Sequence, residues 1–470
     1  MKKIGIFTAL LCILNSIILV NQDLGINVIL FTIPLLVFIV WVLKSNDLIK
    51  NKTGLLFLIP IIILSSTYFI FDNSMKYLNI IVIPFLYLLM YIFTIKPVST
   101  ITDTIIEILN LIIKPLNNIG LFTKDGMKEL PKKEKKKGKH NERNIEILKS
   151  LLIVVPVVIV VLMLLSSADQ IFGQLFDKLF SFKFSWDFMD ELVTRLILFV
   201  MLFFYLGSTL HFLKNEYLKE KRVKKESKEH KPLTMNMLLT ALNIIYLVFD
   251  IIQINSLLLH RVSTGFNYAE YARSGFFQLM IISIINISII LLSKKSKETN
   301  FVKIMSIVLV LLTYVIIVSS YFRMSLYEQA YGYTVLRLWV YIILITEGIL
   351  LLPTIVYILN KNINILGLYL VIGISAYTLN NCVSLDRIIA ENNIERYERT
   401  GKIDLYYLQN NNYDNLNQLR ELYKKVEQDK EIGEIDKNNF RFYIGRMDKK
   451  NKTNLFEYNI SKEQAKEKRD

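Results

Sequence analysis

The chain contains a series of apolar runs, most of them about 17–25 residues long, separated by polar segments. A helix of about 20 residues crosses the roughly 30 Å hydrocarbon core of a bilayer. Backbone groups in lipid have to be satisfied within the segment, so runs of this length favour helices over barrel strands. Because 53% of its 470 residues are hydrophobic and its mean hydropathy is +0.39, we predict a polytopic membrane protein.

We expect about eleven membrane helices, because that many apolar runs are long enough to cross a bilayer. The expected spans are Ile4–Val20, Ile26–Leu43, Gly54–Phe71, Leu78–Ile95, Leu151–Leu165, Leu192–Phe212, Met237–Leu259, Phe276–Leu292, Ile304–Ser320, Leu338–Leu359 and Ile365–Thr378. The first resembles a signal peptide, but no small-x-small cleavage site follows it, so we expect it to stay uncleaved. The predicted fold is an all-α polytopic membrane protein with a small mixed α/β extracytoplasmic domain at its C-terminus.

Basic residues gather in the loops that follow even-numbered spans. These loops hold Lys44 to Lys52, Lys132 to Lys139, Lys219 to Lys231 and Lys294 to Lys303, within a net charge of +15. Lys and Arg favour the cytoplasmic side, so we expect a cytoplasmic N-terminus and an extracytoplasmic tail from Leu379. One span more or fewer would reverse the tail. Abundant Lys, Asn and Ile favour an AT-rich bacterial genome, and therefore a multi-pass protein of a bacterial plasma membrane.

These features predict four regions. They are an N-terminal four-helix membrane segment (1–95), a basic cytoplasmic loop (96–150), a core membrane domain with outer-face motif loops at 260–276 and 321–337 (151–378), and the extracytoplasmic domain (379–470).

Within the last region, Leu385–Thr400 and Tyr413–Gln428 have helical spacing. Gly401 is placed to end the first of these helices, and Asp404 is placed to cap a short helix after it. Alternation over Phe440–Ile444 predicts a strand, which we expect to pair with Leu455–Tyr458 in a hairpin. This hairpin is the basis for a mixed α/β domain.

Three polar segments, rich in tyrosine and charge, carry the most distinctive motifs. They are Gly265–Met280, Arg323–Arg337 and Arg387–Leu408. Within these segments the distinctive stretches are Tyr268-Ala269-Glu270-Tyr271-Ala272-Arg273, Ala330-Tyr331-Gly332, Thr334-Val335-Leu336-Arg337, Asn393-Ile394-Glu395-Arg396-Tyr397 and Thr400-Gly401-Lys402-Ile403-Asp404-Leu405. They resemble motifs of bacterial membrane proteins grouped as the domain-of-unknown-function family 4173, and of the related family 4153. The resemblance runs from about Leu151 to the C-terminus. It implies an architecture and leaves the mechanism open.

The expected topology places all three segments on the outer face, where they would form one site. Its candidate residues are Tyr268, Glu270, Tyr271, Arg273, Arg323, Tyr327, Tyr331, Arg337, Asn392, Glu395, Arg396, Tyr397 and Asp404. Arginines pair with carboxylates in fixed geometry, so the site is interpreted first as a clamp that holds the tail. The alternatives are binding of an anionic lipid headgroup or a cell-envelope component, or catalysis by Glu270, Glu395 or Asp404.

A second set of polar residues falls inside the predicted spans. Asp250, Asn286 and Glu347 each lie about ten residues, or roughly 15 Å, from the outer ends of their spans, and Gln253 shares a helix face with Asp250. No basic residue lies in this intramembrane polar layer. Acids inside a membrane are costly, so either a functional role or hydrogen bonding between helices has to explain them.

Several activities lack their motifs. The sequence has no GxxxxGK[ST] loop, HExxH or G-x-S-x-G motif, and its four histidines and two cysteines form no ligand cluster. We therefore expect no metal, no cofactor and no nucleic-acid partner, and the lipid bilayer as the main partner. The sequence favours a non-enzymatic envelope sensor or scaffold with a clamped tail. An ion- or proton-coupled transporter that uses Asp250 and Glu347 is the alternative, followed by a transferase acting on a lipid-linked or cell-wall substrate.

Overall fold

The computed structural model describes residues 2–96, 104–105, 107–111, 187–212, 232–254, 276–293, 299–360, 362–409, 412–449 and 454–467. The chain divides into two units, one of residues 1–16 and 115–212 and the other of residues 17–114 and 213–470. Every regular element in the described residues is a helix. In the first unit these are most of α1 (Lys2–Ile18) and α9 (Asp187–Phe212).

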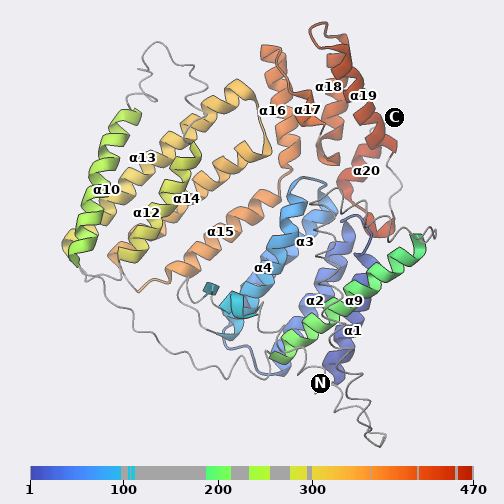
Figure 1. The fold of residues 1–470 in the computed structure, drawn as a ribbon, viewed down its shortest axis with the longest axis horizontal. Helices are drawn as coiled ribbons and strands as arrows, with labels where there is room; N and C mark the ends of the chain where they lie inside the picture. Colours follow the sequence, from blue (N-terminus) through green and yellow to red (C-terminus); the bar gives the residue numbers. More distant parts are fainter. Residues whose placement is uncertain are drawn as a thin grey trace, which may run out of the picture. The chain divides into compact units, whose positions relative to one another are not determined.

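The membrane-type helices of the second unit are apolar on most of their faces. They are α2 (Ile26–Ser45), α3 (Leu58–Ile70) with the short helix η1 before it (Lys52–Phe57), α4 (Met75–Ile95), α10 (Pro232–Gln253), α12 (Phe276–Ser293), α13 (Asn300–Tyr331), α14 (Val335–Leu359) and α15 (Ile365–Asn381). The helices α10, α12 and α14 all pack on α13, and α15 joins α14 to α3, which packs on α2 and α4 (Figure 1). The long helix α13 is therefore the centre of its half of this unit.

Fewer helices than expected meet the length and composition of a membrane span. Among the residues that the structure describes, five do so, namely Ile26–Ser45, Lys52–Ile70, Met75–Ile95, Asn300–Tyr331 and Val335–Leu359, and a sixth is formed if α15 and the next helix are joined across a 62° bend. The expected count of about eleven is not supported. Other apolar helices, such as Met235–Ile251 and Leu279–Ser293, have shorter apolar cores. The expected span Leu151–Leu165 lies outside the described residues.

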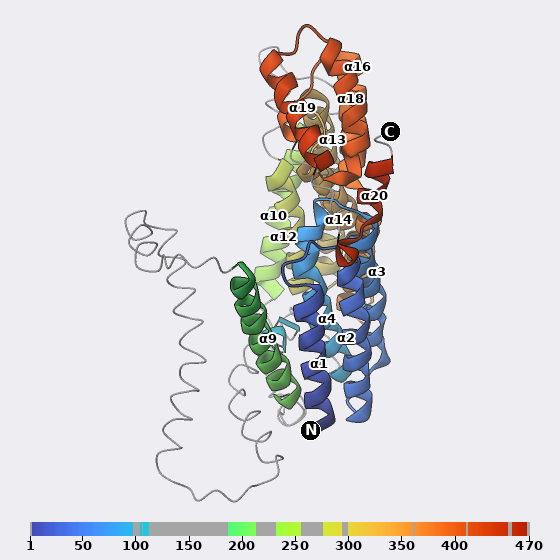
Figure 2. The same ribbon diagram turned by 90° about the vertical axis from the view of Figure 1, so that its right-hand side faces the viewer.

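The tail folds into short helices. They are α16 (Leu385–Thr400), α17 (Leu405–Leu408), η4 (Tyr413–Asn415), α18 (Leu416–Gln428), α19 (Glu434–Lys449), η5 (Leu455–Glu457) and α20 (Ile460–Glu467). Figure 2 shows α16, α18 and α19 grouped beyond one end of the membrane-type helices of this unit. Gly401 ends α16 with a left-handed φ of 68°, and the Asp404 side chain caps α17, so both local predictions are confirmed.

The predicted β-hairpin is wrong. Phe440–Ile444 lies inside α19, and Leu455–Tyr458 contains the short helix η5. Phe440, Tyr443 and Met447 are buried at helical spacing against Leu419 and Leu422 of α18 and their neighbours. This packing overrides a five-residue alternation that also fits a strand, so the described tail is helical and not mixed α/β.

Candidate functional site

Of the three motif segments, the first lies outside the described residues up to the start of α12. The candidates Tyr268, Glu270, Tyr271 and Arg273 are among the residues left out. The other two segments meet where the turn between α13 and α14 contacts α16. We call this contact the joint, and define it by Tyr327–Arg337 on one side and Asn393–Tyr407 on the other.

Asn393 holds the turn on the α14 side. Its side-chain oxygen accepts a hydrogen bond from the Tyr333 N–H at 2.9 Å, and its side-chain NH₂ donates to the Tyr333 carbonyl at 2.9 Å. The turn itself depends on Gly332, whose φ of 85° favours glycine. A Cβ on Gly332 would lie 2.6 Å from Asn393 Oδ1, so a glycine is also needed for this close approach.

Arg396 binds the end of α13. Its guanidinium donates to the carbonyls of Gln329 (3.3 Å) and Ala330 (2.7 Å), and to the Lys402 carbonyl at 3.1 Å. The last carbonyls of a helix have no partner within it, so Arg396 acts as a side-chain cap from another helix. From α17, Tyr407 Oη accepts a hydrogen bond from the Val335 N–H at 2.8 Å.

Aromatic rings and a buried acid complete the α13 side of the joint. The Arg337 guanidinium lies over the Tyr327 ring, 4.4 Å from its centroid, and donates to the Gly332 carbonyl. The Tyr331 ring packs against Tyr327 in a tilted arrangement, with their centroids 4.9 Å apart. The Tyr341 hydroxyl donates to the buried Glu328 carboxylate at 2.9 Å.

The remaining predicted residues have mixed positions. Arg323 is buried on α13, and Asn392 is partly buried on α16. Tyr397 is buried in the tail core, where its hydroxyl bonds Asp429. Glu395 is exposed and pairs with Arg399 at 3.6 Å, while Asp404 caps α17. Both described carboxylates that were candidates for catalysis thus have local structural partners.

A second docking contact was not predicted, and it lies between the tail and the turn after α3. Asp414 of η4 accepts hydrogen bonds from the Asp72 N–H at 2.7 Å and from the Ser384 hydroxyl at 2.6 Å. In return, the Asp72 carboxylate accepts from the Tyr413 N–H at 3.2 Å. We call these residues, together with Asp386, the acidic latch.

Asp386 and Lys76 extend the acidic latch. Asp386 accepts hydrogen bonds from the Ser74 N–H at 2.7 Å and from the Ser74 hydroxyl at 3.2 Å. Lys76 forms an ion pair with Asp72 at 2.7 Å. The carboxylates of Asp72, Asp386 and Asp414 are all buried. Burial raises the pKa of both Asp386 and Asp414 above its ordinary value, although hydrogen bonds oppose the shift.

The end of the tail reaches the start of α2 and the end of α3. The Asn459 side-chain amide donates to the Tyr68 carbonyl at 2.7 Å and to the Phe71 carbonyl at 2.8 Å, satisfying the last turn of α3. The Ile26 N–H donates to the Tyr458 carbonyl at 3.0 Å. No sequence pattern indicated that Asn459 would cap this helix.

The intramembrane polar layer is buried in the second unit. Asp250, Asn286 and Glu347 are all 4% exposed or less. Asn286 donates to Thr313 of α13 at 3.0 Å, and Ser283 of α12 contacts the Glu347 carboxyl. Gln253 is the last residue of α10, and its side chain lies outside the described residues.

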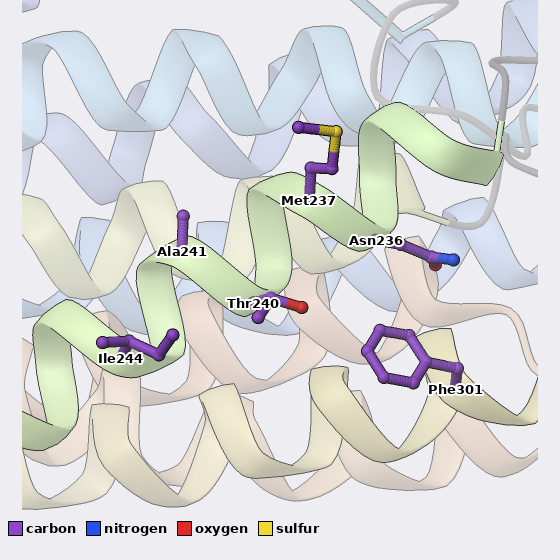
Figure 3. Close-up of a pocket in the computed structure, with 6 residues that line it drawn as sticks. All are labelled: Asn236, Met237, Thr240, Ala241, Ile244 and Phe301. Atoms are coloured by element: carbon purple, nitrogen blue, oxygen red, sulfur yellow. The ribbon is translucent and has the colours of Figure 1, made fainter.

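An open groove of about 490 Å³ lies on α10, and none of its lining residues belongs to either predicted site. It is lined by Asn236, Met237, Thr240, Ala241 and Ile244 of α10, and by Phe301 of α13 (Figure 3). Its lining is mostly apolar, as expected of a surface that contacts lipid chains.

Comparison with known proteins adds a family. Residues 58–422 match a family described as Domain of unknown function (DUF4153), which covers more than half of the chain. This is family 4153, which the sequence motifs indicated as the family related to 4173. A match to family 4173 itself is not shown. No curated protein and no solved structure matches the chain. The chain is therefore a helical membrane protein that belongs to the DUF4153 family.

Proposed function

We propose that this protein is a non-enzymatic scaffold or sensor of the bacterial cell envelope, whose C-terminal region is held rigidly on the membrane helices. The observation that carries the proposal is the joint. Asn393 bonds the backbone of the turn between α13 and α14, Arg396 bonds the last carbonyls of α13, and Tyr407 bonds the first N–H of α14. Side chains used in this way fix one segment against another, as a clamp requires.

The proposal also includes an orientation. The tail contacts the turn before α2, the turn after α3 and the turn between α13 and α14. All three turns follow odd-numbered expected spans, whose loops are poor in Lys and Arg, so we place the tail outside the cytoplasm. There its surface would meet anionic lipid headgroups or another envelope component.

Gly332→Ala is expected to open the joint. The new Cβ would lie 2.6 Å from Asn393 Oδ1, and the φ of 85° disfavours alanine. We expect a loss of about 3 kcal/mol, the sum of backbone strain and displacement of Asn393. In lipid nanodiscs, the Tyr333 amide should exchange its hydrogen about a hundredfold faster, and any envelope component that co-purifies with the wild type should be lost.

Gly401→Ala is the matched control. Gly401 also has a left-handed φ, of 68°, but no atom lies within 4 Å of the position of its Cβ. The Gly401→Ala substitution should lower the stability only by its backbone strain of about 1 kcal/mol, and the Tyr333 amide should stay protected from exchange. Equal behaviour of the two variants, with a protected Tyr333 amide and unchanged co-purification, would contradict the clamp.

Ion- or proton-coupled transport is a second candidate function. It is favoured by the buried carboxyls of Asp250 and Glu347, because acids inside a membrane are usually functional. In proteoliposomes under an imposed potential, Asp250→Asn and Glu347→Gln should each lower proton uptake at least about tenfold if they carry the ion. Glu434→Gln, in the exposed first turn of α19, is the control. Equal uptake by all the variants would exclude this function.

A further inference from the structure

The acids of the polar layer lie at one level of the helix array. Asn243 of α10 donates to the carbonyl of Met305, near the start of α13, at 2.9 Å. Tyr246, one turn further along α10, contacts Asn286 of α12, and Asn286 donates to Thr313, which lies further along α13. A step forward along α10 is therefore a step forward along α13, and the two helices run in the same direction. Helix α12 runs the opposite way, because only a short connection separates it from α13.

This register brings Asp250 and Glu347 close to the same height. Asp250 follows Tyr246 by one turn on α10, and Ser283 precedes Asn286 by one turn on the antiparallel α12. Both steps lead in the same direction from the contact of Tyr246 with Asn286. Because Ser283 contacts the Glu347 carboxyl, the two acids lie about one helical turn from Asn286 on the same side of it.

The contacts of Ser283 indicate where a proton is. Its hydroxyl lies 2.7 Å from the Met280 carbonyl and also contacts Glu347 Oε2. A serine hydroxyl has one proton to donate, and a carbonyl oxygen has none. When Ser283 donates this proton to Met280, its contact with Glu347 is a hydrogen bond if a protonated Glu347 donates to the Ser283 oxygen.

Asp250 lacks partners altogether among the described residues. Neither carboxyl oxygen has a hydrogen-bond partner there, although the residue is only 3% exposed. An ionised carboxylate needs donors or a cation to replace the water it has lost. A neutral carboxyl needs far less, so protonation is the state that this environment favours.

The described helices around these acids supply no other charge that would hold them ionised. Between Lys303 and Arg323, α13 carries no charged residue, and α12 carries none over its whole length. Asp250 is the only charged residue of α10, and Glu347 shares α14 with Arg337 alone. The other titratable groups packed against this core in the described residues are tyrosines, which become negative when they ionise, namely Tyr246, Tyr314, Tyr327, Tyr341 and Tyr369.

We propose that Asp250 and Glu347 are two proton-binding sites in the core formed by α10, α12, α13 and α14, each occupied by a proton and not by a metal cation. A metal ion would need several oxygen ligands around one point. No group of three or more His, Cys, Asp or Glu side chains able to hold a metal occurs in the described part of the chain. The proposal deepens the second candidate function by naming its ion, and depends on that function only for movement of the proton.

The test is chemical labelling in lipid nanodiscs. Dicyclohexylcarbodiimide reacts with protonated carboxyls in apolar surroundings, and mass spectrometry locates the product. At neutral pH we expect label on Asp250 and Glu347, at least tenfold above that on exposed Glu434, with no protection by excess sodium chloride. Infrared spectra should show a protonated-carboxyl band that weakens in Asp250→Asn and Glu347→Gln.

The outcomes separate the two proposals. Labelled carboxyls without proton uptake in proteoliposomes would support the proton-binding sites and exclude transport. Protection by sodium would overturn the proposal in favour of a cation site. Absence of the protonated-carboxyl band from the wild-type infrared spectrum would overturn the proposal directly, even if the labelling reagent does not reach the two carboxyls.

Discussion

Gly25→Ala is expected to detach the end of the tail from α2. Gly25 precedes α2, and a Cβ on it would lie 2.7 Å from the Tyr458 carbonyl oxygen and 2.8 Å from the Glu457 carbonyl carbon. These are backbone atoms that cannot rotate away, so the tail has to move. We expect a loss of about 3 kcal/mol or more from this contact, at the upper end of the cost of overpacking.

The Ile26 amide reports the change directly, because it donates to the Tyr458 carbonyl at 3.0 Å. Its hydrogen exchange in nanodiscs should rise by about a hundredfold, which corresponds to roughly 3 kcal/mol. Protease should also cut the chain faster near Glu457 and Tyr458. Unchanged exchange and cleavage in Gly25→Ala would show that this contact does not hold the tail.

Gly445→Ala is a suitable control for a glycine that has room. Gly445 lies within α19, and no atom lies within 4 Å of the position of its Cβ. Alanine there should stabilise the helix by about 0.5–1 kcal/mol, because glycine lowers helix propensity. The two substitutions therefore make the same chemical change with opposite expected signs.

The parts of the fold that could be predicted from the sequence are those set by local chemistry. Gly401 and Asp404 mark helix ends because a left-handed C-cap and an N-terminal carboxylate are properties of neighbouring residues. The strand predicted at Phe440–Ile444 failed because its alternation is short. Packing on α18, distant in sequence, decides between strand and helix there.

The acidic latch shows what a single sequence leaves out. Asp72 and Asp414 are 342 residues apart, and each is an ordinary polar residue of a turn in its own segment. No periodicity pairs them. The joint was expected, because the family resemblance linked Arg323–Arg337 with Arg387–Leu408. The two hydrogen bonds between Asn393 and Tyr333 were not expected, because they depend on a geometry that only the structure supplies.

Asp414→Ala is expected to open the acidic latch. It removes the acceptor for the Asp72 N–H and for the Ser384 hydroxyl, both of which would stay buried without that partner. Each such group costs about 1–3 kcal/mol, so the turn after α3 should lose about 3 kcal/mol of protection. Hydrogen exchange of the Asp72 amide in nanodiscs measures this loss.

Asp414→Asn separates the hydrogen bonds of Asp414 from its charge. The amide keeps an oxygen for the Asp72 N–H and an NH₂ that can donate to Ser384. Burial raises the pKa of Asp414, so the docked tail binds a proton more tightly than the released tail. That stabilisation is complete below the ordinary pKa of about 4 and is lost as the pH rises through the raised value.

Wild-type docking should therefore be firmer near pH 5 than near pH 7.5, after correction for intrinsic exchange rates. Asp386 shifts in the same direction and should leave part of this dependence in Asp414→Asn. At neutral pH the asparagine variant should stay docked while the alanine variant opens, because neutral asparagine avoids the cost of a buried charge. If asparagine opens the latch as alanine does, the negative charge of Asp414 is needed for docking, and the predicted pH dependence would have the opposite sign.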